Sequence, residues 1–293
     1  MLIITYISLL LIIIYIGSLL FYSLGNLINN YYAKSHHLHP VSIIIAVKNG
    51  EKSIKNILND LDKQNYEGDS EYIIVDDEST DNTAEIIKHF GYKNNKFIYV
   101  SSKEGNQNLF FKKRALDAGI KKSNYEILIF TDVDCRVSKD WVKSMASSFH
   151  NQVDYVIGVS EISNPMNIIS RFQKIDLLMM MTAGRAGCNL DFPIASTGQN
   201  QAYKKNLYYQ NNGFLNIINS IQGDDSLFMH LCRNNKAKIK FNDNKKSFVQ
   251  SRLELQTLPF IKQRIRWAAD AKVMWKYNKQ IFIIFLATFC TNL

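Results

Sequence analysis

The chain has 293 residues, 46% of them hydrophobic, and a formal net charge of +9 at pH 7, so it can bury one large domain or two small ones. The positive charge would suit a nucleic acid, but the sequence holds no aromatic-basic RNA motif and no zinc knuckle, so we expect no nucleic acid and an anionic membrane face instead. Its four cysteines are far apart and form no CxxC pair, which excludes a zinc site and a disulfide framework and fits a reducing cytosol.

The N-terminus is strongly apolar. Residues 2–24 are almost all Leu, Ile, Tyr and Phe, and no charged residue precedes Lys34. As a helix this run would span roughly 34 Å, against about 30 Å for the hydrocarbon core of a bilayer. A cleaved signal peptide is the alternative, but the run has no basic n-region and no small-x-small cleavage site. We therefore predict a transmembrane helix over residues 1–26 and a linker over residues 27–39.

The apolar pattern returns at residues 281–289, after Lys279, the last charged residue. We expect residues 280–293 to be the start of a second membrane segment that is cut off, with a short interfacial or core helix as the alternative. Lys and Arg are dense between the two apolar ends, so the positive-inside rule places the body in the cytoplasm, at the inner or plasma membrane of the cell.

Between these ends, short apolar runs alternate with amphipathic stretches, which is the pattern of an α/β protein built from βαβ units. Strands are predicted at residues 41–47, 72–75, 97–100, 126–131 and 155–159. Helices are predicted from residue 51, at 84–90, 112–120, 141–149 and 168–181, from residue 223 and from Pro259. A loop is expected at residues 192–198.

Polar residues follow three of the predicted strands, as Asn49-Gly50-Glu51, Asp76-Asp77 and Asp132-Val133-Asp134. Ligands of open parallel sheets bind just beyond the carboxyl ends of the strands. The last motif is therefore placed where a metal and a phosphate could meet. Each motif alone is weak, because Asp-x-Asp is commonly a solvated turn and Asp-Asp after a strand is commonly a helix cap.

In chain order, these motifs are followed by Gly223-Asp224-Asp225 and by Gln263-x-x-Arg266-Trp267. The ordered set resembles glycosyltransferase family 2, in its membrane-anchored branch of cellulose, hyaluronan and poly-N-acetylglucosamine synthases and ceramide glucosyltransferases. The resemblance implies a GT-A type fold, a Rossmann-like mixed sheet with flanking helices. In that fold residues 40–160 would bind the nucleotide sugar, and residues 161–279 would bind the acceptor and catalyse transfer.

The resemblance also implies roles for single residues on the donor side. The nucleotide sugar would be bound by Ala46, Asn49, Glu51, Asp77, Lys113 and Asp132. Asp77 would accept a hydrogen bond from the uracil ring N–H. Asp134, together with Asp132, would bind Mg²⁺ or Mn²⁺ at the diphosphate, since both cations prefer oxygen ligands. Many relatives have Gly before the donor-binding lysine, whereas Phe111 stands before Lys112 and Lys113 here, so either lysine is a candidate.

On the acceptor side, the resemblance makes Asp225 the general base, with Asp224 beside it. Inversion needs a base on the face opposite the leaving group. Adjacent carboxylates raise one another's pKa, although either could instead cap the following helix. The loop 197–203 resembles an acceptor-side loop of the family, in which Gln199 and Asn200 would contact a sugar; a plain turn is the alternative.

Gln263, Arg266 and Trp267 fall at positions i, i+3 and i+4, so they share one face of a helix. In the family this face lies by the acceptor and the diphosphate. An Arg266–Asp270 surface pair with Trp267 in the core is the alternative interpretation.

Taken whole, the resemblance implies an inverting, metal-dependent hexosyltransferase that moves a sugar from a UDP-sugar to a lipid or growing polysaccharide acceptor at the cytoplasmic membrane face. An inactive membrane scaffold that retains the fold is one alternative, and the intact acids argue against it. A nucleotidyltransferase is another, but it would not account for Gln263-x-x-Arg266-Trp267 or the apolar ends.

Overall fold

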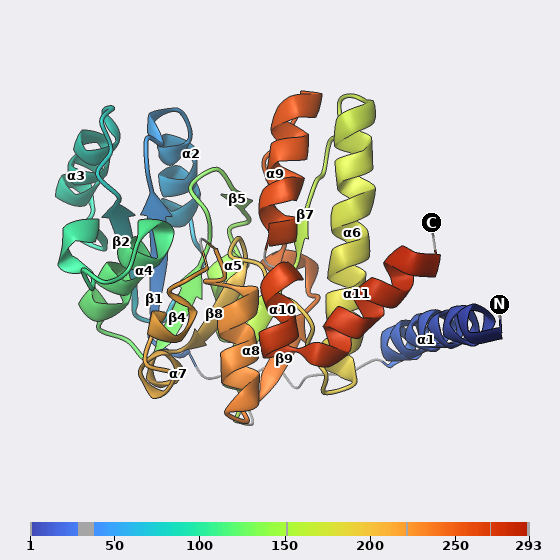
Figure 1. Ribbon diagram of the computed structural model, residues 1–293. Coiled ribbons are helices and arrows are strands. Elements are labelled where there is room, and N and C mark those ends of the chain that lie inside the picture. The colour runs from blue at the N-terminus through green and yellow to red at the C-terminus, as the bar shows by residue number, and fades with distance from the viewer. Residues whose placement is uncertain (1, 29–37, 151, 221, 270, 292–293) are drawn as a thin grey trace.

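The computed structural model describes residues 2–28, 38–150, 152–220, 222–269 and 271–291 (Figure 1). Its main sheet has seven strands in the order β3-β2-β1-β4-β8-β6-β9. Their bounds are β1 Val41–Val47, β2 Ser70–Asp76, β3 Phe97–Ser101, β4 Ile127–Phe130, β6 Tyr155–Gly158, β8 Gln201–Lys204 and β9 Ile239–Asn242. The first four strands are mutually parallel, and β8 runs antiparallel to both β4 and β6. The expected mixed α/β sheet is confirmed.

Helices cover both faces of this sheet. Alternate residues of β1 point to opposite sides, so the strand contributes to a hydrophobic core on each face. Ile44 packs in one core with Leu116 of α4, whereas Ile43 packs in the other with Ile54 of α2 and Trp141 of α5. The helices of the body are α2 Glu51–Asp62, α3 Thr83–Lys93, α4 Phe111–Lys122, α5 Trp141–Ala146, α7 Lys205–Gln210 and α8 Ser226–Asn234. Short 3₁₀ turns occur at η1 Ser102–Glu104, η2 Leu215–Ile217 and η3 Lys245–Ser247.

The five strands predicted from the sequence are confirmed, with ends that differ by at most two residues. The prediction missed β8 and β9. Gln201-Ala202-Tyr203-Lys204 has no β-branched residue, and it becomes a strand because β4 and β6 supply ladder partners on both sides. Tertiary pairing, rather than local sequence, therefore builds the middle of the sheet.

A second, small sheet and two long helices lie beside the main sheet. Its strands are β5 Arg136–Val137, β10 Val249–Gln250 and β7 Ser160–Glu161, in the order β5-β10-β7. Helix α6, Ile168–Asn189, extends eight residues beyond the predicted end and stands next to α9, Thr257–Ala269 (Figure 1). The two helices are joined by an ion pair of 2.6 Å between Arg264 and Asp176 and by the edge-to-face rings of Phe172 and Phe260.

The N-terminal helix α1, Leu2–Leu27, is long and apolar enough over Thr5–Leu27 to cross a membrane. Its C-terminal end docks on α6. Nδ2 of Asn189 donates to the carbonyl of Gly25 at 3.0 Å, and Nη1 of Arg185 donates to the carbonyl of Asn26 at 3.1 Å. Carbonyls in the last turn of a helix lack partners within the helix, and a cation there also suits the helix dipole.

Two further helices, α10 Ala271–Tyr277 and α11 Lys279–Thr291, follow α9, and α11 packs against α1. The expected second apolar segment is thus helical over Lys279–Thr291. The predicted linker falls mostly on residues 29–37, which lie outside the described residues.

Gly25 tests the docking of α1, because a Cβ atom there would lie 2.5 Å from the carbonyl oxygen of Ala186. We expect Gly25→Ala to push the two helices apart and to cost about 1–3 kcal/mol of stability, as overpacking does elsewhere. Gly17→Ala is the matched control, since nothing lies within 4 Å of that position. Thermal unfolding of both variants in detergent checks this, and equal midpoints would show that α1 does not dock on α6.

Candidate functional site

The carboxyl ends of β1, β2 and β4 meet at one edge of the sheet and carry polar loops there. The N–H of Asp77, just after β2, donates to the carbonyl of Val47 at the end of β1, at 2.7 Å. Asp132 follows β4, the neighbour of β1 on its other side. Parallel pairing thus brings two of the expected acids to one edge, as the rule for open sheets requires.

The ammonium group of Lys112, on α4, joins the two halves of the chain. It lies 2.7 Å from Oδ1 of Asp132 and 3.3 Å from Oδ2 of Asp224. Burial lowers the pKa of Lys112, but the charges of Asp132 and Asp224 outweigh burial and raise the pKa, so the group stays charged. A single cation therefore links the donor-side acid to the acid pair that precedes α8.

Asp225 is the N-cap of α8 and also faces this cluster. Its Oδ1 accepts from the N–H of Ser226, and its Oδ2 accepts from the N–H of Gly198 at 3.1 Å. Burial and then the charge of Asp224 raise the pKa of Asp225, against the opposing effect of these N–H groups and Lys112. The residue therefore both caps the helix and offers a carboxylate that is more basic than an exposed one.

Gly198 is a part of this site that the sequence interpretation did not single out. A Cβ atom there would lie 3.0 Å from Nζ of Lys112 and 3.5 Å from Oδ2 of Asp224. A Cβ atom would be in tight contact with the ammonium, so glycine gives the ammonium more room between the carboxylates. The position of Gly198 in the loop 197–203, which the sequence placed near the acceptor, was the signal that could have identified it.

Buried polar side chains fix the loop of Gly198 against the acids. The hydroxyl of Tyr155 donates to Oε1 of Gln201, and its oxygen also lies 3.1 Å from Oγ of Ser196. Nε2 of Gln201 donates to the carbonyl of Asp224 at 3.2 Å, and the N–H of Ser196 donates to Oγ of Ser226 at 3.0 Å. This network was not predicted, because its members are single polar residues in unrelated segments.

Asn200 is fully buried, so the expected sugar contact needs correcting. Its carboxamide accepts from Nε1 of Trp141 at 3.1 Å and donates to the carbonyls of Val159 and Ser247, each at 2.8 Å. The side chain therefore holds three segments together rather than facing a ligand. Gln199, its neighbour, donates through Nε2 to Oγ of Ser251 at 2.9 Å.

The Asp-x-Asp loop after β4 forms a compact group of possible metal ligands. One ligand atom each of Asp132, Asp134 and Cys135 lies within 4.8 Å of the others. Burial and then the charge of Asp132 raise the pKa of Asp134, against the opposing charges of Arg252 and Lys112. Burial also raises the pKa of Cys135 well above its usual value, so its thiol stays neutral. The two carboxylates fit a hard divalent cation such as Mg²⁺ or Mn²⁺.

Asn49 and Glu51, two of the residues expected at the nucleotide, join neighbouring loops. Oδ1 of Asn49 accepts from the N–H of Thr80 at 2.8 Å, and Oε1 of Glu51 accepts from Nδ2 of Asn82 at 2.8 Å. These bonds tie the loop after β1 to the loop after β2. Both side chains therefore shape the edge of the expected pocket.

The other two candidates at this edge are Ala46 and Asp77. Ala46 is half-buried within β1. Asp77 is buried, with its Oδ1 3.4 Å from Nη2 of Arg114, so its carboxylate already has a cationic neighbour.

Lys113, the other lysine expected at the donor, contacts a different segment of the chain. Its ammonium is buried and donates to the carbonyls of Ile217, at 2.6 Å, and Ser220. Successive residues of a helix point in different directions. On α4 it is therefore Lys112 that faces Asp132, while Lys113 fastens the segment before α8.

The motif Gln263-x-x-Arg266-Trp267 lies on α9. Oε1 of Gln263 accepts from Nη1 of Arg264 at 3.1 Å, and Arg266 is exposed. Among the residues that the structure describes, no hydrogen bond or ion pair joins Gln263 or Arg266 to the site acids. The side chain of Trp267, and the whole of Asp270, lie outside the described residues.

Comparisons with known proteins agree with this arrangement. Residues 42–211 match the family model for glycosyl transferase family 2. Poly-beta-1,6-N-acetyl-D-glucosamine synthase of Staphylococcus aureus (strain COL) is 31% identical over 141 residues, which are 47% of this chain and 33% of that protein. The same-named protein of Staphylococcus epidermidis is 32% identical over 147 residues, 49% of this chain and 34% of that protein. The match thus spans about a third of the length of these relatives.

Solved structures share the fold. The mannosyltransferase PcManGT from Pyrobaculum calidifontis, in complex with GDP-Man and Mn²⁺, has a TM-score of 0.68 at 19% identity, over 97% of this chain and 80% of that one. Residues 1–349 of S. aureus TarS, in complex with UDP-GlcNAc, have a TM-score of 0.53 at 20% identity, over 84% and 70% of the two chains. At these identities the likeness shows a common fold.

Replacing Lys112 tests its role as the internal cation. In Lys112→Met, the carboxylates of Asp132, Asp224 and Asp225 face one another without it. We expect the variant to lose about 1–2 kcal/mol of folding stability at neutral pH. This is less than the loss expected on breaking a fully buried ion pair, because the lysine is partly exposed. The pKa of Asp225 is raised in the folded state and rises further in the variant, so the deficit grows as the pH increases from about 5 to about 8.

The control is Lys103→Met, which removes an exposed partner of Glu78 at 3.5 Å. Thermal unfolding measured across this pH range compares the two variants. An equal and pH-independent loss in both would contradict the role given to Lys112.

Proposed function

Because this chain belongs to glycosyl transferase family 2, we propose that it transfers a sugar from a UDP-sugar to a lipid or growing polysaccharide acceptor at the cytoplasmic face of a membrane, with inversion at the anomeric carbon. One observation carries the proposal. Acids from the two halves of the chain, Asp132 on one side and Asp224 on the other, meet at the Lys112 ammonium. Donor and acceptor groups would thus converge on one place.

The donor would lie along the carboxyl edge of β1, β2 and β4. Asp77, which is buried beside Arg114, would accept from the uracil N–H. Asp132 and Asp134 would hold Mg²⁺ or Mn²⁺, which when bound neutralises charge on the diphosphate. The Mn²⁺ in the PcManGT complex and the UDP-GlcNAc in the TarS complex support this choice of cofactor and donor.

Lys112 would stabilise the leaving group as well as the acids. Its charged ammonium already lies between carboxylates of both halves, so a diphosphate at Asp132 would come within its reach. A cation there stabilises the negative charge that develops on the departing UDP. Arg266, exposed on α9, and Gln263 and Trp267 on the same helix would meet the acceptor and the diphosphate from the other side.

Asp225 would act as the general base. The acceptor hydroxyl loses its proton to the Asp225 carboxylate, its oxygen forms a bond to the anomeric carbon, and the bond to the diphosphate breaks with its electrons leaving on UDP. The N–H of Gly198 fixes the orientation of the carboxylate. Asp224, which raises the pKa of Asp225, makes that carboxylate a stronger base.

The substitution Asp225→Asn tests this assignment. We expect transfer to fall by about 10²–10⁴-fold, the usual contribution of a general base, while UDP binding is largely kept. Wild-type transfer should decline as the pH falls, at a higher pH than for an ordinary aspartate, because the pKa of Asp225 is raised and its protonated form is no base. UDP release and UDP calorimetry measure the two effects.

The control for this substitution is Asp154→Asn, which changes an acid paired with Lys204 at 2.9 Å, outside the site. Most of the turnover surviving in Asp225→Asn would show that another group is the base.

The metal assignment makes a separate prediction. Replacing Asp134 with Ala leaves one carboxylate for the cation, so the increase in UDP affinity caused by Mn²⁺ should disappear. Calorimetry of UDP binding with and without Mn²⁺ measures it, again with an Asp154 variant as the control. Unchanged Mn²⁺-dependent affinity in Asp134→Ala would count against the metal role.

A further inference from the structure

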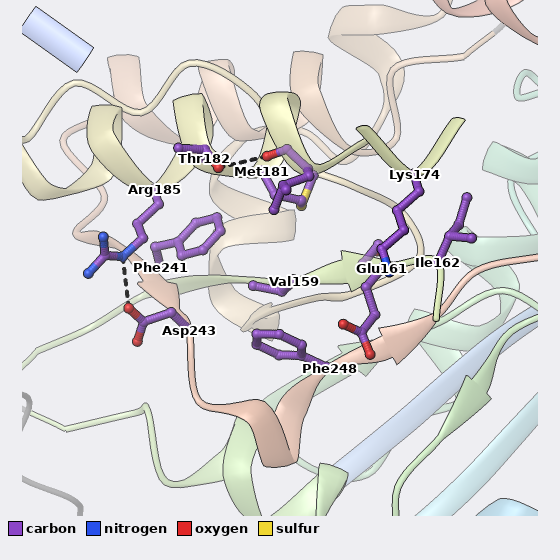
Figure 2. Close-up of a pocket in the computed structure, with 12 residues that line it drawn as sticks. Val159, Glu161, Ile162, Lys174, Met181, Thr182, Arg185, Phe241, Asp243 and Phe248 are labelled. Carbon is purple, nitrogen blue, oxygen red and sulfur yellow. Dashed lines mark hydrogen bonds and ion pairs between the residues drawn. The ribbon is translucent and has the colours of Figure 1, made fainter. Parts of the chain in front are cut away.

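A pocket lies beneath α6, on the side toward the small sheet, and Figure 2 shows its lining residues converging. Its walls come from residues 159–162, from residues 174–185 of α6, and from the end of β9 with the segment that follows it. The apolar side chains of Val159, Met181, Phe241 and Phe248 occupy its middle. The pocket is therefore an apolar groove between a helix and a sheet, separate from the acids at Lys112.

Charged groups stand at the two ends of this groove. At one end Nε of Arg185 lies 2.8 Å from Oδ2 of Asp243, and Nη1 of the same arginine donates to the carbonyl of Asn26 at the end of α1. At the other end are Lys174 and Glu161. Residues 174 and 185 are eleven positions apart on one helix, so the groove runs about 16 Å along α6.

We propose that this groove binds the hydrocarbon chain of an anionic membrane lipid, with Lys174 meeting the lipid head group. A sugar or a nucleotide would need several polar partners along its length, whereas the middle of the groove offers apolar side chains. A hydrocarbon chain gains free energy for each methylene that such a surface buries. The lining therefore selects for an alkyl chain.

The surroundings of the groove indicate that the hydrocarbon chain comes from a membrane lipid. One end abuts the C-terminal end of α1, the helix able to cross a membrane. Leu178 lines the groove and is also 62% exposed, and Ile175 and Met179 beside it on α6 are 58% and 67% exposed. The groove thus opens at Leu178, between its two charged ends, on an apolar surface of α6 from which a lipid chain could enter.

Lys174 suits the head group because it is positively charged and is held only by a weak contact. Its Nζ has a long contact of 3.5 Å with the carbonyl of Ser163, at the surface. A phosphate would attract this ammonium more strongly than a neutral carbonyl does. Arg185 is paired with Asp243, so among the described residues that line the groove Lys174, which stands at the same end as Glu161, is the cation for which the structure shows no ion pair.

The test is photolabelling of the full chain in vesicles of phosphatidylglycerol and phosphatidylcholine. A trace of phosphatidylglycerol with a diazirine at its chain end is activated, and labelled peptides are mapped by mass spectrometry. We expect labels on residues 159–185 and 241–248. Met181→Trp, which fills the groove, should lower that labelling about tenfold, which corresponds to about 1.4 kcal/mol.

Met179→Trp is the matched control, because it is the same change on the same helix at a residue that does not line the groove, and labelling should persist. Val159→Phe narrows the groove from the opposite wall and decides the result if Met181→Trp unfolds early. Lys174→Gln should lower labelling by phosphatidylglycerol about threefold and leave labelling by a matched phosphatidylcholine probe unchanged.

Labels confined to α1 and α11, or equal labels in the wild type and both groove-filling variants, would overturn the proposal. The readout is the position of the label and not sugar transfer, so it stands or falls independently of the proposed function.

Discussion

The Lys112 ammonium holds together carboxylates that would otherwise repel one another, and the site depends on it. Asp132 comes from the end of a parallel strand, and Asp224 and Asp225 come from the turn before α8. Nothing in the local sequence of either segment brings them together. The lysine is in contact with both sides because Gly198 leaves the space and because the Tyr155–Gln201 network fixes the loop.

Helix α6 connects this site to the apolar parts of the molecule. Its C-terminal end receives α1 through Arg185 and Asn189, and the chain then continues directly into the loop that ends at Gly198. The apolar groove lies along the same helix. Helix α6 is therefore in direct chain continuity with the loop that binds Asp225.

The sequence predicted the first half of the fold well, because long apolar runs such as 41–47 and 127–130 form strands wherever their neighbours lie. It also placed acids at the correct edge, since the carboxyl ends of parallel strands meet. It could not give β8, whose pairing is tertiary, nor tell Lys112 from Lys113, because that choice depends on the rotation of α4 against the sheet. Gly198 and Asn200 have roles set by neighbours distant in sequence, so their motif alone could not separate the residue beside the acids from the buried one.

Proton NMR of the reaction of the membrane-inserted protein with a panel of UDP-sugars tests most directly whether the acids gathered at Lys112 support sugar transfer with inversion. We expect that one α-linked donor releases UDP and yields a product with a β-anomeric proton. An α-linked product, or no UDP release from any donor by folded protein, would contradict it.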